Sequence, residues 1–196
     1  MTDQRLGGIA LIAGTLGMLV TMAFHPTAHD FAPGAADAGA RMIAVHWLAI
    51  ATLPLSFLGA LALTRRTAHR LAVAALAVFC LALIAGLVAA TISLAVPALA
   101  RQMADEPAAR LIFRHDAALI QAFGRVIVVA MSAAIALWSA AGRLPRSLAI
   151  YGIAAGVLAI AALASGQIRM DAHGFGLVVL AQAIWMVGAG IDLWRA

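Results

Sequence analysis

The sequence contains no lysine, a single cysteine and few charged residues, and each shortage excludes a class of protein or site. Only 11% of its 196 residues are charged, against about 25% in an ordinary soluble domain. Because Cys80 stands alone, the chain cannot form an internal disulfide or a cysteine-based metal cluster. The sequence also lacks a Walker loop, a dinucleotide-binding glycine pattern, an HExxH motif and a nucleophile elbow. These shortages argue against a soluble protein and favour a role that is not enzymatic.

Hydrophobic residues make up 65% of the chain and gather into six long runs. A helix needs about 20 apolar residues to cross the hydrocarbon core of a bilayer. Since hydrocarbon cannot satisfy backbone N–H and C=O groups, each run is predicted to be an α-helix. The first run is longer than the hydrophobic region of a signal peptide, so we expect it to be retained. The predicted fold is all-α, one domain with six membrane spans at residues 6–24, 42–63, 71–96, 117–141, 148–166 and 174–193.

Arginine is distributed unevenly between the two ends of this predicted bundle. One end carries seven arginines against two aspartates, and the other carries five arginines against six acidic residues. By the positive-inside rule the arginine-rich end faces the cytoplasm, which places both termini there. Abundant Ala, Arg and Leu without Lys is typical of a GC-rich bacterial genome, so we expect a bacterial inner-membrane protein. The net charge of +5 reflects this topology and does not indicate nucleic-acid binding.

Arg125 is the strongest chemical anomaly, because it lies inside the fourth predicted span. An Arg near the bilayer centre costs about 2.5–3.5 kcal/mol on insertion scales, so we expect it to face the bundle interior. No Asp or Glu lies deep in any predicted span to pair with it. Together with Gln121 and Ser132 on the same helical face, and Gln182 in the last span, Arg125 predicts a site for a small anionic ligand. The alternative is that its long side chain only snorkels to the headgroups.

Histidine indicates a second kind of site, because five of the six histidines map to the outer half of the chain. Three of these five have a methionine within one helical turn. Imidazole and thioether groups suit Cu(I), and His or Met ligates haem iron. If they converge, these side chains predict a copper or haem b site made by His25, His46, His115, His173, Met22 and Met42. The alternative is that each histidine bonds headgroups or loop carbonyls. The nearby Asp116 and Asp171 are expected to be helix caps.

Two further patterns concern the packing of the spans. Tryptophans near span ends are expected to anchor the helices at the membrane interface, and these are Trp47, Trp138 and Trp194. Small residues four positions apart allow helices to approach closely. Such pairs occur at Ala10/Gly14, Ala13/Gly17 and Gly152/Gly156.

Three function classes fit these features. The first is a small-solute transporter, or its membrane-embedded substrate-binding subunit, with an outward-facing polar cavity around Arg125. The second is a copper- or haem-binding redox protein that uses the outer histidines. The third is a non-catalytic subunit of a membrane complex, in which Arg125 pairs with an acid of a partner subunit or of a second copy. We favour the first class, since an uncompensated deep Arg is the feature hardest to explain by structure alone.

The size and the six-span layout with both termini inside are similar to those of the substrate-binding subunits of bacterial vitamin-uptake transporters. This resemblance is architectural. No motif of that family matches, so it implies a role for no particular residue.

Overall fold

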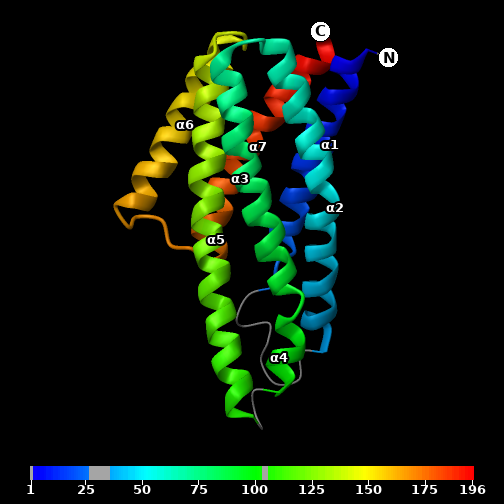
Figure 1. Ribbon diagram of the computed structural model, residues 1–196, viewed down its shortest axis with the longest axis vertical. Helices are drawn as coiled ribbons and strands as arrows, with labels where there is room; N and C mark the ends of the chain where they lie inside the picture. The colour runs from blue at the N-terminus through cyan, green and yellow to red at the C-terminus, as the bar shows by residue number, and fades with distance from the viewer. Residues whose placement is uncertain (1, 27–35, 103–105) are drawn as a thin grey trace.

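The computed structural model describes residues 2–26, 36–102 and 106–196, and within these ranges it is an all-helical bundle without strands (Figure 1). A short helix, α4 (Val96–Gln102), follows the third long one. Six of the described helices are long and apolar enough to cross a membrane, which confirms the predicted all-α fold and the predicted number of membrane-length helices. They are α1 (Asp3–Ala23), α2 (Ala36–Thr67), α3 (Arg70–Ser93), α5 (Pro107–Ala140), α6 (Arg146–Ala164) and α7 (Ala172–Arg195).

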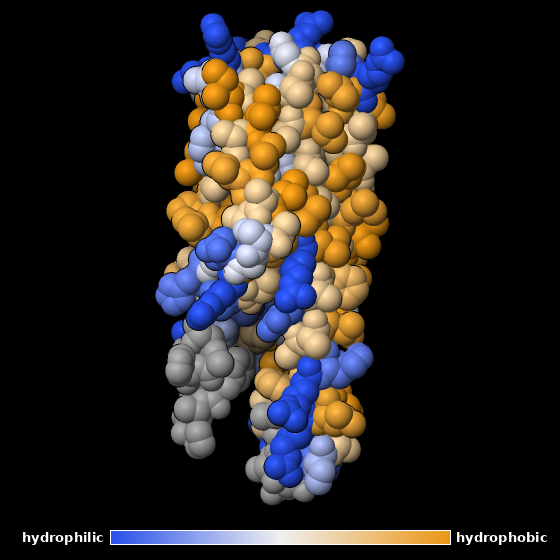
Figure 2. Space-filling model, turned by 90° about the vertical axis from the view of Figure 1, so that its left-hand side faces the viewer, coloured by the Kyte–Doolittle hydropathy of each residue, from blue (hydrophilic) through white to orange (hydrophobic). Residues whose placement is uncertain are grey.

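The long helices form a ring in which α1 packs against α2 and α7, while α5 packs against α3 and α6 (Figure 1). Both termini and the α2–α3 and α5–α6 connections lie at one end of the bundle, which we call the terminal end. The opposite end is the distal end. Figure 2 shows hydrophilic residues at the surface of the terminal end and a broad band of hydrophobic residues below them. The face in this view is apolar between its ends, and exposed large hydrophobic residues occur on all six long helices, as expected of helices that contact lipid.

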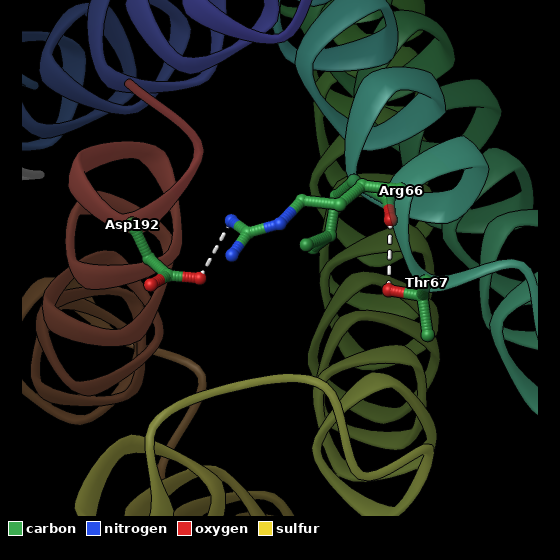
Figure 3. Close-up of polar contacts among 4 residues, drawn as sticks. Arg66, Thr67 and Asp192 are labelled. Carbon is green, nitrogen blue, oxygen red and sulfur yellow. Dashed lines mark hydrogen bonds and ion pairs between the residues drawn. The ribbon is translucent and has the colours of Figure 1, made fainter. Parts of the chain in front are cut away.

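Two polar contacts near the terminal end join helices that are not neighbours in the ring. Arg66 of α2 donates from Nη1 to Oδ2 of Asp192 in α7 at 2.7 Å (Figure 3). Trp138 of α5 donates from Nε1 to the Thr64 hydroxyl of α2 at 3.0 Å. These contacts tie α2 to both α5 and α7 across the ring.

Glycines allow the close approach of helices that the sequence predicted. Gly14 and Gly17 of α1 lie directly against Ser56 and Thr52 of α2. Likewise, Gly156 of α6 lies against the backbone of α5. Helices in a membrane associate through van der Waals packing, so such backbone proximity stabilises the bundle. The small-residue prediction is confirmed at these three glycines.

Trp138 is a correction to the sequence analysis. Its side chain is only 1% exposed, packed among α2, α3 and α7, whereas Trp47 and Trp194 are 58% and 50% exposed. Nearness to the end of a span suggested an interface anchor for all three. Trp138 instead lies on the face of α5 that points into the bundle, so the anchor prediction is wrong for this residue.

The start of α5 also differs from the sequence prediction. The predicted span began at residue 117. The helix begins at Pro107 and runs for 34 residues, about 51 Å at 1.5 Å per residue. Its charged residues before 117 resembled a loop, yet they occupy extra helical turns beyond the apolar run. Asp116 consequently lies inside the helix and is not the predicted cap. By contrast α6 has 19 residues, about 28 Å, which is close to the thickness of a bilayer core.

Candidate functional site

Arg125 lies on α5 where this helix passes the distal end of α6 and the connection from α6 to α7. A pocket of about 520 Å³ opens there. The pocket is lined by Gln121, Arg125, Leu163, Gly166, Ile168, Arg169, Met170 and Asp171. In the space-filling view, hydrophilic atoms gather at mid-height on this side of the molecule, immediately below the hydrophobic band (Figure 2).

The backbone of the α6–α7 connection brings its side chains to α5. Gly166 adopts a φ of +73°, a left-handed conformation that glycine reaches without strain. The N–H groups of Gln167 and Ile168 then both donate to the carbonyl of Ala162, at 2.8 and 3.2 Å. This turn reverses the chain after α6 and directs the following residues across α5.

Gly124 allows the connection to come close to α5. A Cβ atom at this position would lie 2.8 Å from Cε of Met170, so the absence of a side chain makes room for the thioether. This contact brings Arg169 of the connection into the same pocket as Arg125 of α5. Sequence reasoning missed Arg169, because only the turn at Gly166 places it beside a residue 44 positions earlier.

The electrostatics of the pocket favour an anion. Among the described residues, neither Arg125 nor Arg169 forms an ion pair or a side-chain hydrogen bond. The one carboxylate in the lining, Asp171, caps α7 by accepting from the N–H groups of His173 and Gly174 at 3.1 and 2.8 Å. The bond from Gly174 is the main reason that the pKa of Asp171 lies below its usual value. The pocket therefore presents two guanidinium groups against one carboxylate that is already engaged.

Arg125 does not face the bundle interior as the sequence predicted. Its side chain is exposed on the surface of the bundle, where it lines the pocket. The predicted depth assumed that the span began near residue 117, whereas α5 begins at Pro107. Arg125 is thus level with the distal end of α6, because Gly166 and the connection line the same pocket.

Gln121 lines the pocket with Arg125, but the other two predicted ligand residues lie elsewhere. Gln182 of α7 donates from Nε2 to the Ser132 hydroxyl of α5 at 2.9 Å, and both side chains are buried. This bond links two helices within the bundle. The four residues that the sequence grouped are therefore separated into two pairs.

His25 and His46 lie in contact at the distal end of α1 and α2. Their ring centroids are 5.1 Å apart, with an angle of 76° between the ring planes. Nδ1 of His25 lies 2.9 Å from the Pro26 carbonyl, and Nδ1 of His46 lies 2.7 Å from the Met42 carbonyl. Because a carbonyl only accepts, both Nδ1 atoms carry the proton and donate it. Each Nε2 atom is then a bare acceptor, and it bonds to no other described residue.

The helices around this histidine pair are held in register by one cross-helix bond. The hydroxyl of Thr21 in α1 donates to the carbonyl of Val45 in α2 at 3.2 Å, next to His46. His46 is buried and His25 is partly buried. Burial lowers the pKa of His25 below its ordinary value, although the bond to Pro26 opposes this shift. Burial therefore favours the neutral form of His25 over the charged form.

The larger metal site predicted from the sequence is not assembled. His115 is exposed beside Asp116, with Nδ1 at 3.7 Å from Oδ1, and His173 is exposed in the first turn of α7. Within the described ranges, no three His, Cys, Asp or Glu side chains gather as a metal-binding group. Of the four predicted histidines, only His25 and His46 come together. Met42 is buried and Met22 partly buried, each within one turn of one of them.

No protein-family model, no curated protein and no solved structure matches this chain.

Proposed function

We propose that this protein binds a small anionic ligand at the edge of the membrane and serves as the substrate-binding subunit of a transport system. The observation that carries this proposal is the pocket in which Arg125 and Arg169 share one space of about 520 Å³. The two residues come from different elements. Neither forms an ion pair among the described residues, and Asp171, the carboxylate on which the charge of Arg169 acts, is engaged in capping α7. Two guanidinium groups that line one pocket give it a positive potential, which a bound anion would neutralise.

The lining indicates what kind of ligand fits. A guanidinium group offers a planar fork of donors that matches a carboxylate or a phosphate, and Gln121 adds a neutral amide. Leu163 and Ile168 form apolar walls beside these donors. A volume of several hundred Å³ is typical of sites for small molecules. The expected ligand is therefore a small organic acid or phosphate ester with an apolar part.

Arg125→Ala is expected to weaken anion binding by about 10–100-fold, because a hydrogen bond to a charged group contributes roughly 1.5–3 kcal/mol. Purified protein would be titrated with a panel of carboxylates and phosphate monoesters, with thermal unfolding as the readout, since a ligand that binds the folded state raises Tm. Arg125→Lys is expected to restore only part of the affinity, because an ammonium group lacks the planar fork.

Arg114→Ala is the matched control, since Arg114 is exposed on the same helix and does not line the pocket. It should bind the panel as the unmodified protein does. The proposal fails if no anion of the panel raises Tm, or if Arg125→Ala binds as tightly as the Arg114→Ala control.

The proposed orientation places the terminal end in the cytoplasm of a bacterial cell, so that the pocket opens on the outer side of the inner membrane. It rests on the excess of arginine at the terminal end. In a Cys80→Ala background, an impermeant maleimide added to intact cells should label Gln167→Cys. Arg143→Cys should react only after permeabilisation. Both positions are exposed, so burial does not confound the comparison. The reverse labelling pattern would show that the pocket faces the cytoplasm.

A further inference from the structure

The His25–His46 pair supports an inference that is independent of the Arg125 pocket. We propose that these two imidazoles bind one Cu(I) ion through their Nε2 atoms, at the distal end of α1 and α2. The pair joins the end of one span to the first half of the next, and the Thr21–Val45 bond fixes the two helices beside it. Three observations carry the assignment: the hydrogen bonds of the two rings, the separation of the rings and the neighbouring residues.

The hydrogen bonds of both rings leave the correct atom for a metal. Histidines that ligate metals generally donate their other N–H to a carboxylate or a backbone carbonyl, which fixes the tautomer and the ring orientation. His25 and His46 both show this arrangement, with Nδ1 bonded to the carbonyls of Pro26 and Met42.

The separation of the rings fits one shared ion. With metal–nitrogen bonds near 2 Å and a roughly tetrahedral angle, two imidazoles on one ion have ring centroids about 5 Å apart. The observed separation is 5.1 Å. Two axial ligands on opposite faces of a haem iron would instead have centroids about 6 Å apart, by the same bond lengths. The pair therefore fits a bent metal site better than a haem held between both histidines.

The neighbouring side chains favour copper in its reduced state. Two neutral imidazoles supply no negative charge, and no third His, Cys, Asp or Glu joins them among the described residues. A divalent ion in this partly buried place would remain poorly compensated, whereas a monovalent ion costs less to desolvate. Met22 and Met42 lie three and four residues before the two histidines. Thioether ligands select Cu(I) over harder ions, so either methionine could complete the site.

The test is a titration of the purified full-length protein with Cu(I), under ascorbate and without oxygen, against a competing Cu(I) chelator. The unmodified protein should bind one Cu(I) per chain. His25→Gln and His46→Gln should each weaken binding at least about 100-fold, since loss of a ligand costs more than the 10–100-fold loss of a supporting partner. His115→Gln and His173→Gln are matched controls, because both histidines are exposed and outside the pair. Both should keep the original affinity.

X-ray absorption of the Cu(I)-loaded unmodified protein gives a second measurement that needs no variant. It should show nitrogen ligands near 2 Å from the copper, which keeps the proposal testable even if His46→Gln does not fold. The proposal is overturned if the unmodified protein loses Cu(I) to the chelator completely, or if the spectrum shows no nitrogen ligand. It is equally overturned if His25→Gln binds Cu(I) unchanged, or if a control variant abolishes binding.

Discussion

Trp138→Ala is expected to lower the free energy of unfolding by about 3–5 kcal/mol, the range for truncation of a large buried aromatic side chain. Trp138 is 1% exposed, and its ring stacks on Trp185 with centroids 6.0 Å apart. It meets Phe79 edge-on at 5.4 Å and donates from Nε1 to the Thr64 hydroxyl. Truncation would leave a cavity among four helices and remove this donor from a buried hydroxyl.

Reversible unfolding of the detergent-solubilised protein would measure this loss. Trp47→Ala is the matched control, because the same side chain is 58% exposed there and its truncation opens no cavity. Its effect should stay within about 0.5 kcal/mol, as for most surface substitutions. Equal destabilisation by the two variants would contradict the assignment of Trp138 to the core.

Gly59→Ala should destabilise the bundle by about 3 kcal/mol, the upper part of the usual range for overpacking. A Cβ atom at Gly59 of α2 would lie 2.6 Å from the backbone N and Cα atoms of Leu11 in α1. Backbone atoms cannot rotate aside, so the two helices must separate to accept even one methyl group. Helix contact in a membrane depends on such close packing.

Gly86→Ala provides the comparison for this second substitution. A Cβ atom at Gly86 of α3 would meet only side-chain methyl groups of Ile127 and Leu53, at 3.9 Å. Alanine favours a helix over glycine by up to about 1 kcal/mol, so this variant should be neutral or slightly more stable. If both alanine variants unfold alike, the α1–α2 contact at Gly59 is looser than the structure describes.

The six spans could be read from the sequence because a bilayer imposes a single rule on every crossing segment. A run of about 20 apolar residues must be helical there, whatever its neighbours are. The start of α5 could not be predicted in this way, because the first turns of the helix lie outside the apolar run. They carry the charged residues Arg110, Arg114 and Asp116. Pro107 was the available signal, since proline is favoured in the first turn of a helix.

The candidate sites could be predicted only as far as helical periodicity reaches. Gln121 and Arg125 are four residues apart on one helix, so their shared face followed from the sequence. Arg169 could not be assigned to them, because its position depends on the turn at Gly166. The spacing of methionines one helical turn before three of the histidines predicted a metal site. Which of them meet depends on how α1 and α2 pack, and periodicity within one helix contains no such information.

The unequal lengths of α5 and α6 have a consequence for the membrane around the protein. A bilayer matched to the 19 residues of α6 covers little more than half of the 34 residues of α5. In a thicker bilayer, hydrophobic mismatch would draw the connection after Gly166 towards hydrocarbon, together with its arginine, at a cost of fractions of a kcal/mol per Å. In a thinner bilayer the pocket would lie outside the hydrocarbon layer. Lipid thickness would thus regulate access to Arg125, so the affinity for the proposed anion should differ between membranes of different composition.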